Sequence, residues 1–153
     1  MTHPVASDAA SPGSLGRAAA WLSKQVELAL VDVGLTLPQY RVLGLLGEGA
    51  SIPSALAERL TVRRPTITAV VDGLETRGLV ERAGAAGDRR SVTHTITAKG
   101  RRVLGEADRA VDARLGAIAA SLDDPELTEQ ALGSLALWRL AMRAHHAART
   151  VRT

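Results

Sequence analysis

The order of patterns in the middle of the chain constrains its fold more than any other feature. Two short helical patterns, 53–60 and 64–77, are separated by three residues, and two strand patterns, 79–82 and 91–97, follow them. The loop between the strands consists of small residues and ends in Asp-Arg-Arg. This order is typical of a winged helix-turn-helix, in which the second helix lies in the major groove of DNA and the hairpin tip reaches the adjacent minor groove.

Local signals predict where several other elements begin and end. Apolar residues spaced three and four apart predict a helix over 14–33 that stops at Gly34. Thr36 and Gln39 have the spacing of a capping box, which predicts that the next helix starts there. We expect Ser51 to cap the first of the two short helices.

Two long amphipathic helices are predicted to finish the chain, over 98–122 and from the Asp124-Pro125 cap to Ala148. Together with the first helix they are too apolar to be loose tails, so we expect them to build a homodimer; the alternative is that they pack on their own domain. The expected fold is mainly α with a small two- to three-stranded β wing. The expected organisation is a tail over 1–13, a dimerisation helix over 14–34, a DNA-binding domain over 36–100, dimerisation helices over 101–148 and a tail over 149–153.

The distribution of charge supports a polyanion as the partner. The net charge of the chain is +3, but residues 59–102 carry ten Lys or Arg against four Asp or Glu, a net +6. A basic segment between slightly acidic ends indicates a local DNA-binding face. The alternative is a winged-helix module whose basic face binds an acidic protein, and salt-dependent preference for a palindromic duplex would separate the two.

Several classes of function are disfavoured by what the sequence does not contain. It has no cysteine, and we find no phosphate-binding loop, zinc-protease motif or nucleophile elbow, so we expect neither an enzyme nor a cofactor. The histidines are scattered, which argues against a metal site, and His94 is interpreted as a surface residue. We find no membrane-spanning run and no signal peptide, so we expect a cytoplasmic protein.

Specific motifs resemble those of the multiple-antibiotic-resistance regulator (MarR) family, densely over residues 36–104. They are SALAERL at 54–60, RPTIT at 64–68, VDGLETRGLVER at 71–82, DRRS at 88–91 and TITAKG at 95–100. The resemblance implies a homodimeric transcriptional regulator, of the repressor type, with a winged helix-turn-helix in each subunit. Two-fold symmetry then predicts a pseudopalindromic DNA site.

The resemblance also implies which residues contact DNA. The predicted DNA-binding residues are Arg63, Arg64, Pro65, Thr66, Thr68, Arg89 and Arg90, with Arg90 in the minor groove and Asp88 holding its guanidinium. Two positions depart from the family pattern. Arg63 replaces the usual serine N-cap, at a cost of about 1 kcal/mol, and adds a charge that attracts phosphate. Ala69 replaces a polar or basic residue, so we expect fewer direct base contacts.

Many members of this family are released from DNA by small aromatic or phenolic anions. These ligands bind between the dimer helices and the winged domain, where the resemblance makes Arg17, Trp21 and Tyr40 candidate lining residues. The alternative for Trp21 and Tyr40 is ordinary packing in the core or the interface.

Overall fold

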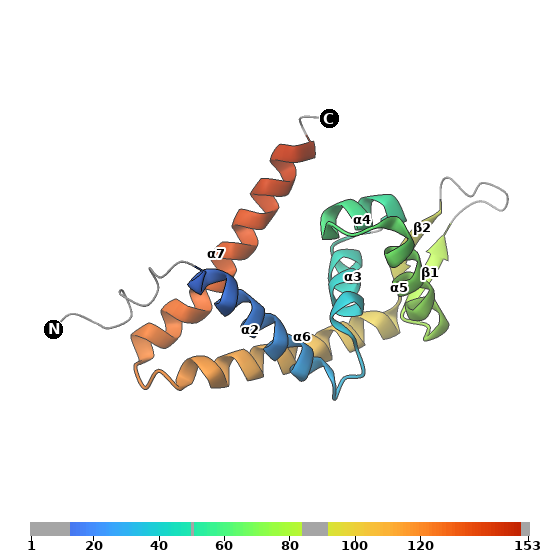
Figure 1. Cartoon of the computed structure of the whole chain (residues 1–153). Helices are drawn as coiled ribbons and strands as arrows, with labels where there is room; N and C mark the ends of the chain where they lie inside the picture. The colour runs from blue at the N-terminus through green and yellow to red at the C-terminus, as the bar shows by residue number, and fades with distance from the viewer. Residues whose placement is uncertain (1–12, 50, 84–91, 151–153) are drawn as a thin grey trace.

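The structure, a computed structural model, describes residues 13–49, 51–83 and 92–150. A compact group of short helices with a two-stranded antiparallel sheet lies at one end, and the last two helices extend from it (Figure 1). The elements in chain order are α2 (Ser14–Leu30), α3 (Leu37–Glu48), α4 (Pro53–Leu60), α5 (Arg64–Thr76), β1 (Val80–Ala83), β2 (Thr93–Ile96), α6 (Ala98–Ala120) and α7 (Pro125–Thr150). The predicted fold class, mainly α with a small β wing, is confirmed.

Side-chain caps set the starts of α3 and α7 as predicted. The hydroxyl of Thr36 accepts from the amide of Gln39 at 3.3 Å, and the Gln39 side chain accepts from the Thr36 amide at 3.1 Å. The carboxylate of Asp124 accepts from the amides of Glu126 and Leu127 at 2.9 and 3.2 Å. These starts were predictable because each cap joins residues that are near neighbours in the chain.

Four helices end at residues other than those predicted, and for α5 the difference is one residue, since it ends at Thr76 and not at Arg77. Helix α2 ends at Leu30 instead of Val33, and the chain makes one further turn to Gly34, where a φ of 69° reverses its direction. Helix α6 ends at Ala120, whereas α7 continues to Thr150, two residues beyond its predicted end. No helix in the described ranges is both long and apolar enough to cross a membrane.

Ser51 does not cap α4, so that prediction is wrong. The N-cap is Ile52, and the backbone of Ser51 instead pairs with His94 in both directions, with N···O distances of 3.1 and 2.8 Å. The bridge draws the segment before α4 against β2 and adds a single residue of a third strand. This agrees with a wing of two to three strands.

His94 is buried, so its predicted surface position is also wrong. Strands β1 and β2 pair in antiparallel register with Arg82 opposite His94. Along β2 the buried residues are His94 and Ile96, and only 2% of the His94 surface is exposed. Because side chains alternate between the two faces of a strand, placing Ile96 in the core also directs the residue two positions earlier toward it.

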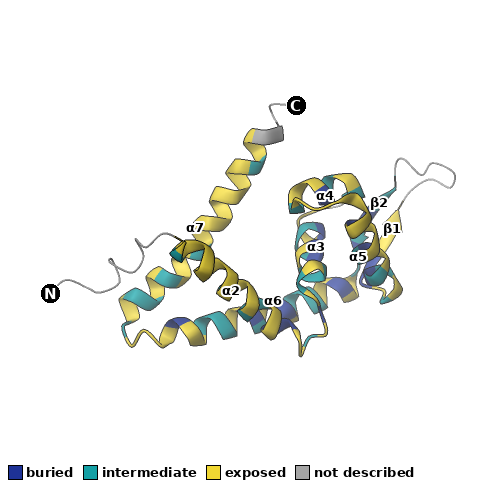
Figure 2. Ribbon diagram, in the orientation of Figure 1, coloured by how far each residue is buried: buried dark blue, intermediate teal, exposed yellow. Residues whose placement is uncertain are grey.

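The apolar core lies in the winged-helix half of the molecule and beneath the end of α2. Its most buried members are Leu30, Val42, Leu43, Leu46, Leu56, Ile67, Val71, Leu74 and Leu79. Figure 2 shows these buried segments gathered around α3 and α5, whereas α7 is exposed along most of its length. The last helix therefore makes little use of its apolar side chains within one chain.

Candidate nucleic-acid interface

Helix α5 has one face in the core and one face in solvent. Ile67, Val71 and Leu74 are buried against the other helices. The predicted DNA-contact residues of this segment, Arg63, Arg64, Pro65, Thr66 and Thr68, are all exposed. The burial pattern therefore leaves the predicted contact residues free to meet a ligand while apolar packing holds the helix in place.

The N-terminus of α5 is a positively charged end. The N-cap residue is Arg63, and its side chain makes no capping hydrogen bond. Arg63 and Arg64 are exposed beside first-turn amides that no side chain caps. Uncapped amides, the positive end of the helix dipole and two guanidinium groups together favour binding of a phosphate.

The middle of the exposed face has few hydrogen-bond donors. The hydroxyl of Thr68 donates to the carbonyl of Arg64 at 3.2 Å, so its oxygen remains available mainly as an acceptor. Ala69 is exposed and carries only a methyl group. This face can accept a hydrogen bond from a base amino group or contact a thymine methyl.

Several basic residues of the segment hold the fold together. Arg77 donates to the carbonyl of Gly34 at 2.9 Å, Lys99 donates to the carbonyl of Arg77 at 2.7 Å, and Arg59 pairs with Glu48 at 2.8 Å. The net charge of +6 counted along the sequence therefore overstates the charge available to an external anion.

Side-chain hydrogen bonds join the two strands at the base of the hairpin, and its tip lies outside the described residues. Two cross-strand bonds hold the base, from the Thr93 hydroxyl to the carbonyl of Ala83 at 2.9 Å and from the Thr95 hydroxyl to Glu81 at 3.2 Å. Asp88, Arg89 and Arg90, the predicted wing residues, fall within 84–91, which the structure does not describe.

A group of charged side chains that the sequence analysis missed joins α5 to the wing. Nε2 of His94 lies 3.2 Å from Oε1 of Glu75, and the same oxygen lies 3.6 Å from Nε of Arg82. Arg82 also approaches Asp72, at 4.0 Å. Burial holds the pKa of His94 below its ordinary range; Arg82 acts in the same direction, and Glu75 and Asp72 oppose it. We refer to these four residues as the His94 junction.

A cleft of about 1330 Å³ separates the winged-helix half from the C-terminal half of α7. Tyr40 lines it and donates a hydrogen bond to Asp108 at 2.7 Å; burial and this carboxylate raise the pKa of Tyr40 above its ordinary range. Of the three predicted ligand residues, the described cleft includes only Tyr40. Arg17 and Trp21 lie exposed on α2.

An ion cluster links the two walls of this cleft. Glu48 of α3 pairs with Arg59 of α4 and with Arg143 of α7. The hydrogen bond from Arg59 is the main cause of a lowered pKa of Glu48, and Arg143 acts in the same direction. Nε2 of His146 lies 2.6 Å from the carbonyl oxygen of Arg59. The cleft lining also includes Arg41 and Arg139, so its charge is positive.

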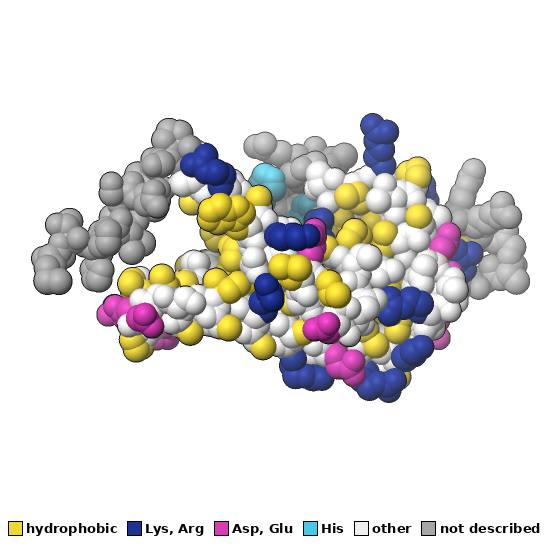
Figure 3. Space-filling view, turned by 60° about the horizontal axis from the view of Figure 1, so that its bottom comes forward, with side chains coloured by type: hydrophobic (Ala, Val, Ile, Leu, Met, Phe, Trp, Pro, Cys, Tyr) yellow, Lys and Arg dark blue, Asp and Glu magenta, His cyan; other side chains and the backbone are white. Residues whose placement is uncertain are grey.

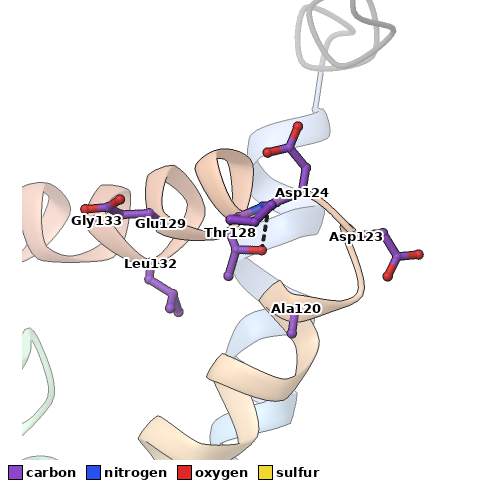
Figure 4. Close-up of a pocket in the computed structure, with 8 residues that line it drawn as sticks. Ala120, Asp123, Asp124, Thr128, Glu129, Leu132 and Gly133 are labelled. Carbon is purple, nitrogen blue, oxygen red and sulfur yellow. Dashed lines mark hydrogen bonds between the residues drawn. The ribbon is translucent and has the colours of Figure 1, made fainter.

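A second hollow, beside the turn between α6 and α7, is not a metal site. Its acidic residues are Asp123, Asp124 and Glu129, and Figure 4 shows their carboxylates pointing in different directions. Asp124 is already used as the cap of α7. Within the described ranges no group of three or more His, Asp or Glu could hold a metal ion.

The helices outside the winged-helix half expose many large apolar side chains. They are Leu15, Trp21, Leu28 and Val31 near α2, Ile118 and Leu122 at the end of α6, and Leu132, Leu137, Trp138, Leu140 and Met142 on α7. In Figure 3 apolar side chains appear along the arm that α6 and α7 form, and several Lys and Arg side chains appear over the winged-helix half. Large apolar side chains exposed together are typical of surfaces that associate with other proteins.

Comparisons with known proteins agree with this geometry. Residues 33–91 match the profile of the MarR family. The chain is 33% identical over 126 residues to the HTH-type transcriptional repressor Rv2887 of Mycobacterium tuberculosis, covering 82% of this chain and 91% of the repressor. The crystal structure of Rv2887 with salicylic acid superposes with a TM-score of 0.65 at 31% identity, covering 86% of this chain and 96% of that one. A MarR-family regulator from Rhodococcus sp. RHA1 superposes with a TM-score of 0.67 at 28% identity, covering 88% and 94%.

Proposed function

The chain belongs to the MarR family of transcriptional regulators, and from this premise we propose that it represses transcription as a homodimer bound to a pseudopalindromic DNA site. The observation that carries the proposal is the exposed face of α5, which presents Arg64, Thr66 and Thr68 opposite a buried apolar face. In a two-fold symmetric dimer, two such helices would enter major grooves about 34 Å apart, one turn of DNA. DNA as the partner would place this activity in the cytoplasm.

The exposed apolar residues of α2, α6 and α7 support the dimer. Helix α2 packs on α6 within the chain, where Arg114 donates to Gln25 at 2.8 Å, yet Trp21 and Leu28 remain exposed on α2. A second copy is the natural occupant because a two-fold axis lets the same patch cover itself. We propose that residues 14–34 and 101–148 form this interface and that 36–100 form the DNA-binding domain.

We further propose that Arg89 and Arg90 carry the tip of the wing into the minor groove and that Asp88 orients Arg90. The support comes from the antiparallel strands β1 and β2, which carry the two ends of this loop and pack against α5 through β1. A narrow minor groove has a strong negative potential, which attracts guanidinium groups without reading every base. The wing would therefore contribute affinity more than sequence preference.

Selection of bound duplexes from a random pool tests the proposed function. The protein should enrich a pseudopalindrome, here called the selected duplex, and bind it more tightly than a scrambled duplex of equal length. Affinity should fall steeply with salt as counterions are released from the phosphates. Equal affinity for the selected and scrambled duplexes would refute the proposal and favour the alternative of a module that binds an acidic protein.

Two substitutions should distinguish recognition of a base by Thr68 from the attraction of the Arg90 charge to DNA of any sequence. Thr68→Val removes the hydroxyl but keeps the shape, and should weaken binding to the selected duplex by about 1 kcal/mol while leaving the scrambled duplex unaffected. Arg90→Ala should weaken binding to both duplexes, on the order of tenfold. Fluorescence anisotropy with each labelled duplex measures both effects. An unchanged affinity of Arg90→Ala would show that the wing does not contribute to binding. An equal loss of affinity for both duplexes in Thr68→Val would show that the hydroxyl does not recognise a base.

We also propose that a small aromatic or phenolic anion releases the DNA by binding in the cleft beside Tyr40. The cleft combines apolar side chains, including Trp138 and Met142, with an excess of arginine, and the related repressor Rv2887 has been crystallised with salicylic acid. Salicylate is expected to lower the anisotropy of the selected complex, whereas benzylamine, an aromatic cation, should not. Equal effects of both compounds would contradict a charge-selective cleft.

A further inference from the structure

His94 lies where α5, the proposed recognition helix, meets the wing strands β1 and β2 and the segment before α4. Its backbone pairs with Ser51 in both directions, and its cross-strand partner is Arg82 of β1. Its ring is buried against α5 and lies beside Glu75. One residue therefore contacts three different segments of the chain.

A histidine is a costly residue for this position. Neither ring nitrogen has an aligned hydrogen bond to any described residue, although Nε2 lies 3.2 Å from Oε1 of Glu75. A buried polar group without aligned hydrogen bonds lowers stability, and a leucine could occupy a similar volume without that cost. The feature that favours a histidine here is the charged pair beside the ring, Glu75 and Arg82.

The charges that face the ring come from two elements. Glu75 and Asp72 project from α5 and Arg82 projects from β1, whereas the buried residues of α3 and α6, which also pack against β2, carry no charge. Glu75 lies between His94 and Arg82, within 3.2 Å of one and 3.6 Å of the other. The Glu75 carboxylate of α5 is thus close to both His94 and Arg82, which are opposite each other in the wing.

We propose that His94 is a positioning residue for DNA binding, which fixes the orientation of the wing relative to the recognition helix through Glu75 and Arg82. The inference rests on the proposed DNA-binding function. The helix and the hairpin must enter neighbouring grooves at the same time, so a small rotation between them displaces one from its groove. Glu75 lies near the end of α5, far along the helix from Arg64 and Thr66, and therefore orients the helix without contacting DNA.

Protonation of the ring should loosen this junction. A proton on His94 places a cation in a buried site close to Arg82, and burial holds the pKa below its ordinary value of 6.5. Because the ring binds its proton less readily in the packed junction than in the unfolded or loosened chain, the junction is fully stable above this value. That stability is lost progressively as the pH falls below it.

The pH profile of DNA binding tests the proposal. Affinity for the selected duplex is measured one pH unit above and one below the ordinary pKa of 6.5, for the full chain and for His94→Leu. Between these two values the unmodified protein should lose affinity by several-fold to about tenfold more than His94→Leu. The variant keeps His145 and His146, so the difference isolates His94. A His94→Leu protein that matches the unmodified protein at both pH values overturns the inference.

A pair of carboxylate variants keeps the test decisive if His94→Leu does not fold. Glu75→Gln should lower affinity for the selected duplex at both pH values, because it removes the carboxylate close to both His94 and Arg82, and the loss between the two pH values should persist or grow because the ring then has no carboxylate to stabilise its proton. Glu81→Gln makes the same change in charge on the other face of β1, beside Thr95, and should keep the profile of the unmodified protein. A Glu75→Gln protein with the same affinity as Glu81→Gln at both pH values overturns the inference. Failure of the unmodified protein to prefer the selected duplex would instead refute the proposed function.

Discussion

Replacing Gly100 with alanine is expected to lower the free energy of unfolding by about 3 kcal/mol, because the added methyl group has no space. A Cβ at this position would lie 2.1 Å from the carbonyl oxygen of Leu79 and 2.8 Å from Cγ1 of Ile96. Gly100 belongs to the first turn of α6, where the long helix leaves the wing. The clash would therefore separate the DNA-binding half from the helix that connects it to the rest of the molecule.

The backbone near Leu79 cannot move aside easily, since it is bonded to the start of α6. The carbonyl of Leu79 accepts from the amide of Thr97 at 3.1 Å, and the carbonyl of Gly78 accepts from the Thr97 hydroxyl at 2.8 Å. One residue earlier, the carbonyl of Arg77 accepts from Lys99 at 2.7 Å. Displacing this segment to admit a methyl group would break several of these bonds.

Urea denaturation at a fixed protein concentration measures this effect, with Gly105→Ala as the matched control. Gly105 lies in the same helix, and a Cβ there would meet only the flexible end of Arg109, at 3.7 Å. Its replacement should raise stability by up to about 1 kcal/mol through helix propensity. An unfolding midpoint of Gly100→Ala equal to that of Gly105→Ala would show that the close approach to Leu79 is not needed.

Replacing Leu137 with glutamate is expected to convert the proposed homodimer to monomers and to reduce affinity for the selected duplex by about a thousandfold or more. Leu137 is 67% exposed on α7 and is flanked by the exposed Trp138 and Leu140. In a symmetric interface each substitution occurs twice, and each unpaired carboxylate would cost several kcal/mol when desolvated. A monomer could engage only one half-site at a time.

Sedimentation analysis over a range of concentrations measures the oligomeric state, and anisotropy measures DNA binding. If Leu137→Glu still sediments as a dimer and binds the selected duplex normally, then this part of α7 is not the interface. A chain that is monomeric before any substitution would refute the dimer itself.

Local chemistry made most helix starts and the class of the fold predictable. Thr36 with Gln39 and the Asp124 cap act between near neighbours, so residue identity and spacing alone identify them. Alternation of buried and exposed positions on α5 is also a local property: Ile67 and Val71 are buried, whereas Thr68 and Ala69 between them are exposed. The roles proposed for those exposed residues, and for the wing arginines, stay predictions.

The tertiary structure determined which partners several polar groups contact. Ser51 has the identity of a helix cap but pairs with His94, because the fold brings the segment before α4 beside β2. Arg77 and Lys99 add to the basic count but donate to backbone carbonyls 43 and 22 positions away. Composition and periodicity thus determine which elements form, since these depend on neighbours in the chain. Which polar groups become buried, shared or free depends on contacts between distant segments, and these exist only after the elements have packed.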